Sequence, residues 1–515
     1  MIWGARRETE WQSDKGAKWQ SGRVAEWPKT ECGVIGKPDT TTRIDENRTM
    51  VINRIQVTAV LLCVATLSST FADDLPRFDR FYGYKAVASE ATGFFRVEEI
   101  GGRWWFITPE GHPFFSTGVN VVNMSGTATK AGRHYYREAA EAKYATREAW
   151  AEAQHKRLID WGWNTIGAWS DWNAFRDKMP YTFILYMGDR NWEGGPKGDP
   201  FDPAFRESCR AAFEQELAPL KEDPYLLGVF LSNEMKWGPD HRGYHLLDDF
   251  MKKPAAAAGK VRLIAFLEER YETIDALKED FRTPAQTWDA LAKETYLTSR
   301  TTPAALETQL DWSADVAEAF FKTTNEEFRR VDPNHLNLGV RFISQFTPRR
   351  VIEVAGRHVD VMSINFYEMR GRFEEVLQSL SPDYLPVDDC LAAHYKYGRR
   401  PILISEWGYR AADVGLPNSW PPIYPTLATQ KDRAEAYEAD FRRDLAAPYI
   451  IGQHWFLFAD QPPEGRFDGE DNNFGLVNEK DEPYEELVNR SKIMYNEVYR
   501  SLKAEPLKAE SRDAD

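Results

Sequence analysis

The stretch LLGVFLSNEMKWG, Leu226–Gly238, is an apolar run of strand length that ends in the polar pair Asn233 and Glu234. The stretch PILISEWG, Pro401–Gly408, has the same pattern, because a short apolar run there delivers Glu406. Such runs are typical of buried parallel strands, whose C-terminal ends carry the functional residues of (β/α)8 barrels. We therefore expect these two glutamates at two strand ends of one barrel.

Eight strand-like runs follow one another along the chain, and helical stretches separate most of them. This alternation predicts an α/β fold with a parallel sheet, here a (β/α)8 TIM barrel over residues 114–503. The two glutamates stand at the ends of the fourth and seventh runs. The eight runs are Phe114–Asn120, Thr165–Ser170, Tyr181–Met187, Leu227–Asn233, Leu336–Phe342, Val359–Tyr367, Pro401–Glu406 and Ile450–Asp460.

Helices are expected where apolar residues recur with i, i+3, i+4 spacing. The hundred or so residues between the fourth and fifth runs predict a helical insertion at about 237–303, either a lid or subsite wall or a solvated decoration. Residues 73–113 are expected to form an N-terminal extension with a hairpin, and residues 504–515 a flexible tail. The clearest helical stretches are Arg137–Asp160, Ala204–Lys221, Asp311–Val331 and Gln430–Ala446.

A secretory signal peptide is expected at residues 50–72. The apolar run Val57–Leu67 follows Arg54, and Thr70 and Ala72 are the small residues before cleavage. The run is too short to span a bilayer. Signal peptides stand at the N-terminus, so Met50 is the better start, and residues 1–49 are an unstructured or mis-assigned leader. The mature protein is expected to be secreted or periplasmic, with no membrane partner after signal removal.

Composition and charge narrow the classes of partner and cofactor. The formal net charge of −15 argues against nucleic acid, whereas the 18 Trp and 22 Tyr offer flat faces on which a weakly charged ligand can stack. The four cysteines match no metal motif, and Cys209 and Cys390 either pair or are buried thiols. Of nine histidines, only His241 and His245 have i, i+4 spacing, without a third ligand. No metal and no cofactor is expected.

Two carboxylates across a barrel predict hydrolysis of a glycosidic bond. If configuration is retained, one protonated acid and one ionised group stand about 5 Å apart, because the second must reach the anomeric carbon. Glu234 is the expected acid/base, its pKa raised by partial burial, and Glu406 the expected nucleophile. Asn233 is placed to bond the sugar hydroxyl next to the reacting carbon.

Other polar and aromatic residues near the strand ends are candidates for the same site. Tyr367 is placed to donate a hydrogen bond to Glu406, although a buried Tyr with a satisfied hydroxyl is an equal alternative. Trp455 is placed to stack on a sugar, and Trp237 and Trp407 each follow a candidate glutamate. His454 is expected to be a core histidine with its hydrogen bonds satisfied. The stretch 469–473, GEDNN, has no EF-hand spacing and predicts a solvated turn, with sugar contact by Glu470 or Asn472 as another option.

An ordered set of motifs resembles the clan A glycoside hydrolases, and the closest likeness is to the β-agarases of glycoside hydrolase family 50. The resemblance covers roughly residues 95–478 and implies a retaining mechanism, with Glu234 as acid/base and Glu406 as nucleophile. It also implies that six residues face the cleft, namely Asn164, Trp169, Asp171, Asn365, Tyr367 and Trp455. The motifs are LGVFLSNEMKWG after Asp223-Pro224-Tyr225, GWNTIGAWSD (162–171), SINFYE (363–368), LISEWG (403–408) and GQHWFLFADQP (452–462).

The sequence departs from the agarases in one respect. Those enzymes usually carry a β-sandwich before the barrel, and here only about forty residues separate Ala72 from the first strand, so subsites built by that domain would be missing. The expected function is a secreted retaining hydrolase of a β-linked polysaccharide or oligosaccharide, agarase-like or β-galactosidase-like, with agarose or another galactan as the candidate substrate. The alternative is a secreted carbohydrate-binding barrel without catalysis.

Overall fold

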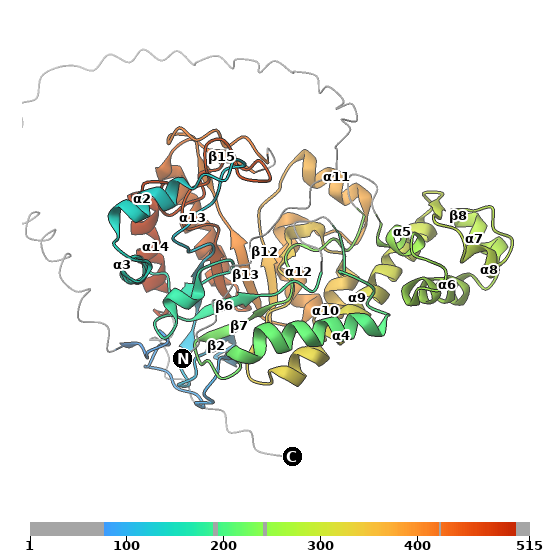
Figure 1. Cartoon of the computed structure of the whole chain (residues 1–515), viewed down its shortest axis with the longest axis horizontal. Coiled ribbons are helices and arrows are strands. Elements are labelled where there is room, and N and C mark those ends of the chain that lie inside the picture. The colour runs from blue at the N-terminus through green and yellow to red at the C-terminus, as the bar shows by residue number, and fades with distance from the viewer. Residues whose placement is uncertain (1–76, 189–193, 240–244, 422–423, 501–515) are drawn as a thin grey trace, which may run out of the picture. The chain divides into compact units, whose positions relative to one another are not determined.

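The computed structural model describes residues 77–188, 194–239, 245–421 and 424–500 (Figure 1). The expected leader, signal peptide and C-terminal tail lie outside these residues, as does His241. The described chain begins with a small antiparallel sheet of β1 (Arg96–Ile100), β2 (Arg103–Ile107) and β3 (Pro113–Phe114). Gly101 and Gly102 turn between β1 and β2 with φ of 61° and 74°, a conformation that glycine adopts without steric cost.

The central sheet is parallel throughout and runs in the order β10-β7-β6-β5-β4-β16-β13-β12-β11. Its two edge strands, β10 and β11, both lie in the short segment 336–343. Because these two edges are neighbours in the sequence, the sheet must curl round on itself. An α/β fold with a curled parallel sheet is therefore confirmed. The strands are β4 (Ser116–Val119), β5 (Thr165–Ile166), β6 (Tyr181–Ile184), β7 (Leu226–Phe230), β10 (Leu336–Asn337), β11 (Phe342–Ile343), β12 (Met362–Asn365), β13 (Ile402–Trp407) and β16 (Ile450–Trp455).

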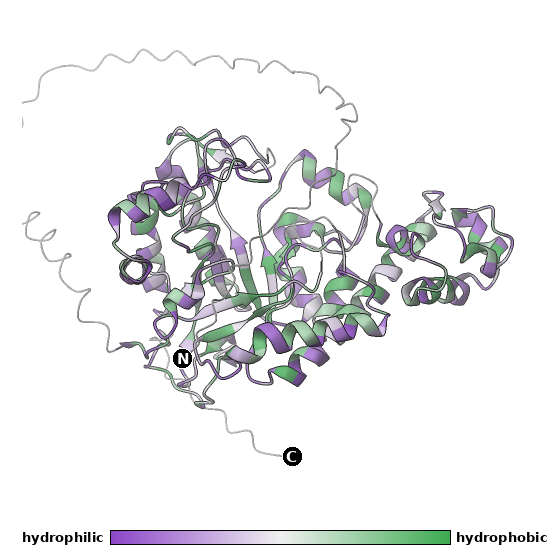
Figure 2. Ribbon diagram, viewed as in Figure 1, coloured by the Kyte–Doolittle hydropathy of each residue, from purple (hydrophilic) through white to green (hydrophobic). Residues whose placement is uncertain are grey.

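The strands form the core because both of their faces are covered. Every residue of β7, β13 and β16 is buried, as expected for parallel strands with a continuous apolar sequence. Figure 2 shows largely hydrophobic central strands, surrounded by helices of mixed hydropathy. The predicted runs Val359–Tyr367 and Ile450–Asp460 are longer than β12 and β16, because apolar loop residues such as Phe456 and Phe458 are also buried beyond the strand ends.

Helices follow most of the strands, but only the 3-10 helix η2 (Trp172–Phe175) lies between β5 and β6. The predicted helix at 137–160 is two helices, because Thr146 caps the second by accepting a hydrogen bond from the Ala149 backbone. None of the described helices is long and apolar enough to cross a membrane. They include α2 (Tyr135–Lys143), α3 (Arg147–Asp160), α4 (Pro203–Ala212), α9 (Pro303–Val331), α10 (Arg349–Ala355), α11 (Arg372–Leu380), α12 (Cys390–Gly398), α13 (Gln430–Ala446) and α14 (Glu485–Val498).

Four short helices and a two-stranded ribbon occupy the long connection between β7 and β10. They pack beside α9 in Figure 1. The Trp312 ring on α9 lies 5.1 Å from the Phe250 ring and 5.4 Å from the Phe266 ring, and ion pairs join Arg262 to Asp315. This packing ties the segment to the first half of α9. The elements are α5 (Leu246–Met251), α6 (Ala258–Tyr271), α7 (Ile274–Asp280), α8 (Trp288–Leu291), β8 (Phe281–Arg282) and β9 (Thr298–Ser299).

Close packing between β4 and β16 explains a glycine and a histidine of the core. A Cβ on Gly118 would lie 2.3 Å from the His454 ring, so only glycine fits there. The His454 Nε2 is 2.8 Å from the Ser116 hydroxyl, and burial lowers the pKa of His454 to about 3. His454 is therefore a buried, uncharged core histidine, but it is not the fully satisfied one that was predicted, because its Nδ1 has no hydrogen-bond partner among the described residues. Cys209 and Cys390 are both buried and unpaired, which settles the choice between a disulfide and two thiols.

Glu327 on α9 offers a test of how α4 and α9 are held together. Its buried carboxylate pairs with Arg206 at 2.9 Å, Arg210 at 2.9 Å and Arg330 at 3.0 Å, and these bonds lower its pKa to about 2. The ordinary pKa is about 4.3, so this stabilisation is present above about pH 4 and is lost as pH falls toward 2. We expect Glu327→Gln to lower the free energy of unfolding by about 1–2 kcal/mol at pH 7, since the arginines are partly exposed.

Urea denaturation at pH 7 and pH 3 measures this change. The difference between parent and variant should shrink at pH 3. Glu326→Gln is the control on the same helix, because Glu326 is 44% exposed and, within the part of the chain that the structure describes, forms an ion pair with Arg206 alone. An equal loss of stability at both pH values would contradict the assignment.

Candidate active site

Glu406 lies on β13, one residue before the strand ends, and three donors surround its carboxylate. The Tyr367 hydroxyl donates to Oε1 at 2.8 Å, the Arg341 Nη2 donates to Oε2 at 2.8 Å, and the Asn365 Nδ2 lies 3.3 Å from Oε2. The carboxylate is 9% exposed. Charge-assisted hydrogen bonds of this kind hold the carboxylate in one orientation, because both of its oxygens are bonded. The hydrogen bond from Tyr367 to Glu406 is therefore present, as the sequence predicted.

Arg341 is the fully buried cation of the site. It follows β10, has a φ of 51°, and also donates to the Ser405 carbonyl at 2.8 Å. Its guanidinium carbon lies 4.2 Å from the centre of the Trp169 ring and 5.3 Å from that of Phe230. The two rings take the place of water on the faces of the guanidinium, which is favourable for a desolvated arginine. Arg341 thus supplies a fixed positive charge directly behind Glu406.

Asn365, the last residue of β12, joins the two glutamates. Its Nδ2 lies 2.9 Å from the Glu234 Oε1, 3.3 Å from the Glu406 Oε2 and 3.1 Å from the Asn233 Oδ1. Its Oδ1 accepts a hydrogen bond from the Ser405 hydroxyl at 2.8 Å, which sets the orientation of the amide. The structure therefore brings Asn233, Glu234, Asn365 and Glu406 together around one amide nitrogen.

The backbone at Glu234 is held in an unusual conformation. Glu234 lies four residues beyond β7 with a φ of 52°, and its N–H donates to the Arg341 carbonyl at 3.2 Å. A residue other than glycine in this region costs roughly 1–3 kcal/mol, and such conformations cluster at functional sites. The surrounding contacts thus force the Glu234 side chain toward Asn365.

The environment separates the two carboxyl groups in their acidity. Burial raises the pKa of Glu234 to about 8, and the negative charge of Glu406 adds to this effect. Asn365 and Arg341 act in the opposite direction but do not outweigh them. Glu234 is therefore protonated at neutral pH. It lies beside the Glu406 carboxylate, which accepts hydrogen bonds from three donors. A buried carboxyl group with a raised pKa beside a second carboxylate is typical of a catalytic acid and its partner.

A third carboxylate, Glu470, stands close enough for its charge to act on both glutamates. It pairs with Arg466 at 2.7 Å and accepts a hydrogen bond from Gln461 at 2.6 Å, and burial raises its pKa to about 7. The stretch 469–473 is mostly buried, and Asn472 and Asn473 are fully so, so the predicted solvated turn is wrong. The loop folds back over the sheet and bonds to Asn418 and Gln461 instead.

Aromatic rings line the space around the carboxyl groups. Tyr424 stacks on Tyr367 with ring centres 4.6 Å apart, and its pKa is raised well above the ordinary value by burial and by the nearby carboxylates. Phe456 meets Trp169 edge-on at 6.4 Å. A polar cluster between aromatic faces suits a ligand with an apolar face and a hydroxylated edge.

Three of the tryptophans expected to bind substrate are core residues. Trp455 is fully buried and donates from Nε1 to the Phe474 carbonyl at 2.8 Å. Trp407 stacks on Tyr437 at 5.3 Å and meets Trp455 edge-on. Trp237 stacks on Phe321 of α9 at 5.5 Å. Trp407 directly follows Glu406 on β13, and successive side chains of a strand point to opposite faces, so its ring points away from the site. Phe456 occupies the place at the site that was expected for Trp455.

The prediction that Asn164 faces the cleft is also wrong. It precedes β5, at the strand end opposite to the glutamates. Its Nδ2 donates to the Phe115 carbonyl at 2.9 Å, and its Oδ1 accepts from the Thr117 backbone N–H at 2.9 Å. Asn164 thus ties β4 to β5 as a structural residue and does not face the site.

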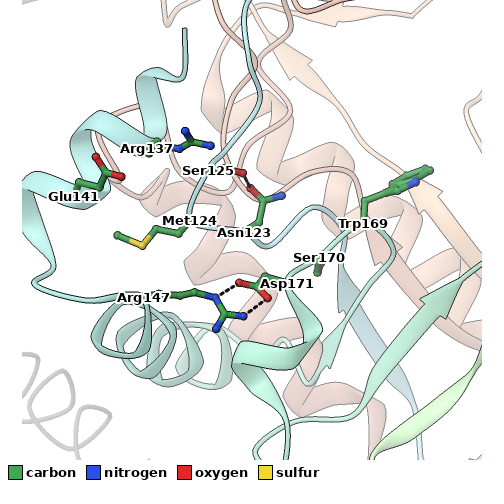
Figure 3. Close-up of a pocket in the computed structure, with 9 residues that line it drawn as sticks. All are labelled: Asn123, Met124, Ser125, Arg137, Glu141, Arg147, Trp169, Ser170 and Asp171. Carbon is green, nitrogen blue, oxygen red and sulfur yellow. Dashed lines mark hydrogen bonds and ion pairs between the residues drawn. The ribbon is translucent and has the colours of Figure 1, made fainter. Parts of the chain in front are cut away.

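Trp169 and Asp171 follow β5 and line a groove together with residues of the loop after β4 and of α2 (Figure 3). Trp169 has a φ of 59° and donates from Nε1 to the Tyr186 hydroxyl. The Asp171 carboxylate forms a two-pronged ion pair with Arg147. Both residues are partly exposed, and that they face the substrate cleft stays a prediction.

Sequence reasoning missed Arg341, Phe456 and Arg466, and it named Glu470 only as an optional sugar contact. Arg341 has a recognisable signal, because it follows the run at 336–340 in the same way as the glutamates follow theirs. Phe456 comes directly after β16, whereas Glu470 lies in the long loop beyond it, and loop paths have no periodic signal in sequence. Among the described residues, no group of three or more His, Cys, Asp or Glu side chains is arranged to hold a metal ion.

Comparison with known sequences identifies relatives named as agarases. The chain is 27% identical over 489 residues to β-agarase B of Vibrio sp. (strain JT0107), which covers 80% of this chain and 49% of that protein. It is 26% identical over 468 residues to β-agarase A of the same organism, covering 77% and 45%. The chain thus spans about half the length of the curated relatives it matches. No family model matches the chain. The predicted resemblance to β-agarases is confirmed.

Solved structures show the same fold. An agarase, AgWH50C, superposes with a TM-score of 0.69 at 23% identity, covering 88% of this chain and 72% of that one. An exo-β-agarase superposes with a TM-score of 0.70 at 22% identity, covering 87% and 70%. The protein BpGH50 covers 83% of this chain and 87% of its own with a TM-score of 0.61 at 20% identity. The α/β architecture of this chain is therefore that of these proteins.

The buried pair of Arg341 and Glu406 leads to a stability prediction. Removing one partner leaves the other as an uncompensated buried charge, which costs about 3–5 kcal/mol. We expect Arg341→Met to lower the free energy of unfolding by that amount. Glu406→Gln should cost less, because Glu406 is next to the open site.

The double variant Arg341→Met/Glu406→Gln should recover a large part of the loss, since no unpaired charge remains. Urea denaturation of the four proteins gives the coupling free energy between the two residues. Additive losses, with no recovery in the double variant, would show that the pair is not the source of the stabilisation.

Proposed function

We propose that the protein is a retaining glycoside hydrolase that cleaves a β-linked galactan, agarase-like or β-galactosidase-like, by double displacement. The observation that carries this proposal is the contact of both glutamates with one amide nitrogen, Asn365 Nδ2. The two bonds limit the separation of the Glu234 Oε1 and the Glu406 Oε2 to about 6 Å. Retaining enzymes place their carboxyl groups about 5–5.5 Å apart, whereas inverting enzymes need about 6.5–9.5 Å for an intervening water.

We also infer that the curled sheet is a closed barrel of eight strand segments. Segment 336–343 pairs through β10 with β7 and through β11 with β12, so β10 and β11 act as two halves of the fifth strand. Backbone bonds continue this pairing, from Leu231 N–H to the Gly339 carbonyl and from Leu338 N–H to the Val229 carbonyl. In this arrangement both glutamates project from the C-terminal face of the barrel, where such folds carry out their chemistry.

The first step of the proposed reaction forms a bond to the enzyme. A Glu406 oxygen attacks the anomeric carbon while the glycosidic C–O bond breaks, and Glu234 gives its proton to the leaving oxygen. Arg341 and Tyr367 keep Glu406 aligned for the attack. Asn365 and Asn233 stand where a bond to the neighbouring sugar hydroxyl can strengthen at the transition state.

The second step returns the enzyme to its starting state. Glu234, now ionised, takes a proton from a water molecule whose oxygen attacks the anomeric carbon, and the bond to Glu406 breaks. The product keeps its configuration because two inversions occur at the same carbon. The raised pKa of Glu234 suits both roles, since the group must be protonated in one step and ionised in the next.

The substrate and the location are inferred from the relatives, the lining of the site and the N-terminal sequence. Two relatives are named β-agarases, and a neutral, hydroxylated ligand fits the aromatic and polar lining of the site. We therefore propose agarose or a related galactan, supplied to an enzyme that acts outside the cytoplasm. The apolar run Val57–Leu67 and the small residues before position 73 support export.

Glu234→Ala and Glu406→Ala variants test the division of roles. Glu406→Ala should abolish turnover of every substrate, and azide should restore activity with inverted product, because the small anion fills the space of the nucleophile. Glu234→Ala should lose about 10²- to 10⁴-fold on a natural galactan but keep activity on an aryl glycoside with a good leaving group. Azide should then speed release with a retained product.

The pH dependence separates the two residues further. In the parent, kcat/KM on the galactan should fall above about pH 8, since Glu234 must be protonated. That alkaline limb should disappear for Glu234→Ala on the activated glycoside. Near-parent activity of Glu406→Ala, or inverted product from the parent by NMR, would refute the mechanism. Galactan binding without any hydrolysis would favour a carbohydrate-binding protein instead.

A further inference from the structure

A groove of about 470 Å³ opens beside Trp169, between the loop after β4, the helix α2 and the loop after β5 (Figure 3). Its volume falls within the roughly 300–1,000 Å³ of small-molecule sites in proteins. Because β4 and β5 are parallel to β7 and β13, these loops leave the sheet at the same end as the two glutamates. The groove therefore opens on the same face as the candidate active site.

The base of the groove is held in place by short contacts. The Val122 N–H donates to the Ser170 hydroxyl at 2.8 Å, and the Asp171 N–H donates to the Val122 carbonyl at 2.9 Å. The ion pair of Arg147 and Asp171 joins the start of α3 to the loop after β5. A binding site whose walls are already fixed loses little entropy when a ligand enters.

Three polar side chains of the groove have unused hydrogen-bonding capacity. Within the described residues, no hydrogen bond or ion pair involves the side chains of Arg137 and Glu141, which project from α2, and none uses the Asn123 Nδ2. The Met124 thioether and the Trp169 indole supply apolar surface between them. Hydroxyl-binding groups around an apolar face match the two sides of a sugar ring.

The charges of the groove are balanced. Arg137 and Arg147 offset Glu141 and Asp171, so the groove has no excess of positive charge with which to attract a sulfate or a carboxylate. An uncharged ligand loses the least binding free energy on entering such a site, because it need not displace an existing ion pair. The chemistry thus favours a neutral sugar over an anionic one.

Trp169 connects the groove to the reacting residues. One face of its ring lies 4.2 Å from the Arg341 guanidinium carbon, and the same guanidinium bonds Glu406 at 2.8 Å. We propose that the groove is a distal subsite of the cleft, which binds an uncharged sugar residue further along the galactan chain; this rests on the proposed function. The substrate is then an oligomer that passes Trp169, and binding strengthens with chain length.

Binding titrations test the subsite without relying on turnover. Neutral agarose-derived oligosaccharides of two to eight sugar units are titrated by calorimetry into the protein, in a Glu234→Gln background that stops hydrolysis. Asn123→Ala/Arg137→Met should weaken binding of the longest oligosaccharides about tenfold, as expected for two lost hydrogen bonds, and should weaken the disaccharide much less. Arg137→Met alone should give about half of that loss on a logarithmic scale. Arg137 is exposed, so its replacement leaves the packing of α2 intact.

Arg133→Met is the matched control, because Arg133 is an exposed arginine just before α2 that pairs with Glu138 and not with the groove. It should bind every length as the parent does. Equal weakening at all lengths, or no weakening at any length, would overturn the subsite. Tighter binding of sulfated oligosaccharides, lost in the double variant, would overturn its neutrality. Length-dependent binding without hydrolysis by the parent would refute the proposed function but leave the subsite standing.

Discussion

The buried ion pair of Arg341 and Glu406 is the interaction on which the site depends. Two charges taken out of water are costly unless they are paired, and here the Arg341 Nη2 bonds a carboxylate and a backbone carbonyl while two aromatic rings cover the guanidinium. Burial is the larger cause of the raised pKa of Glu234, and the negative charge of Glu406 adds to it. The acidity of Glu234 therefore depends on its enclosure and on the carboxylate beside it.

A single side chain, Asn365, holds the two glutamates in fixed positions relative to each other. Its amide nitrogen touches residues from the loop after β7 and from β13, so three strand ends are fixed relative to one another. The strained backbone at Glu234 is kept in place by the same contacts and by the Arg341 carbonyl. Fixed donors and charges of this kind act on a reacting centre without having to reorganise, which is how preorganised sites lower a barrier.

The strands and the two glutamates could be predicted from sequence because buried parallel strands have continuous apolar runs, and a polar residue that ends such a run is conspicuous. The tryptophans could not, since alternation along a strand sends Trp407 and Trp455 away from the site and toward Tyr437. Asn164 precedes β5, so it lies at the end of the sheet opposite to the glutamates. Glu470 depends on a long loop, which follows tertiary packing rather than a local pattern.

The central claim is that Glu406 forms a covalent bond to the sugar, and a trapped intermediate tests it most directly. A 2-fluoro-β-galactoside with a good leaving group slows both steps but leaves the second slower, so the glycosyl-enzyme accumulates. Mass spectrometry of the proteolysed adduct should locate one fluorosugar on the peptide that contains Glu406, and on no other. An adduct on Glu234 or Glu470, or no adduct with an enzyme that still hydrolyses the parent glycoside, would contradict the account.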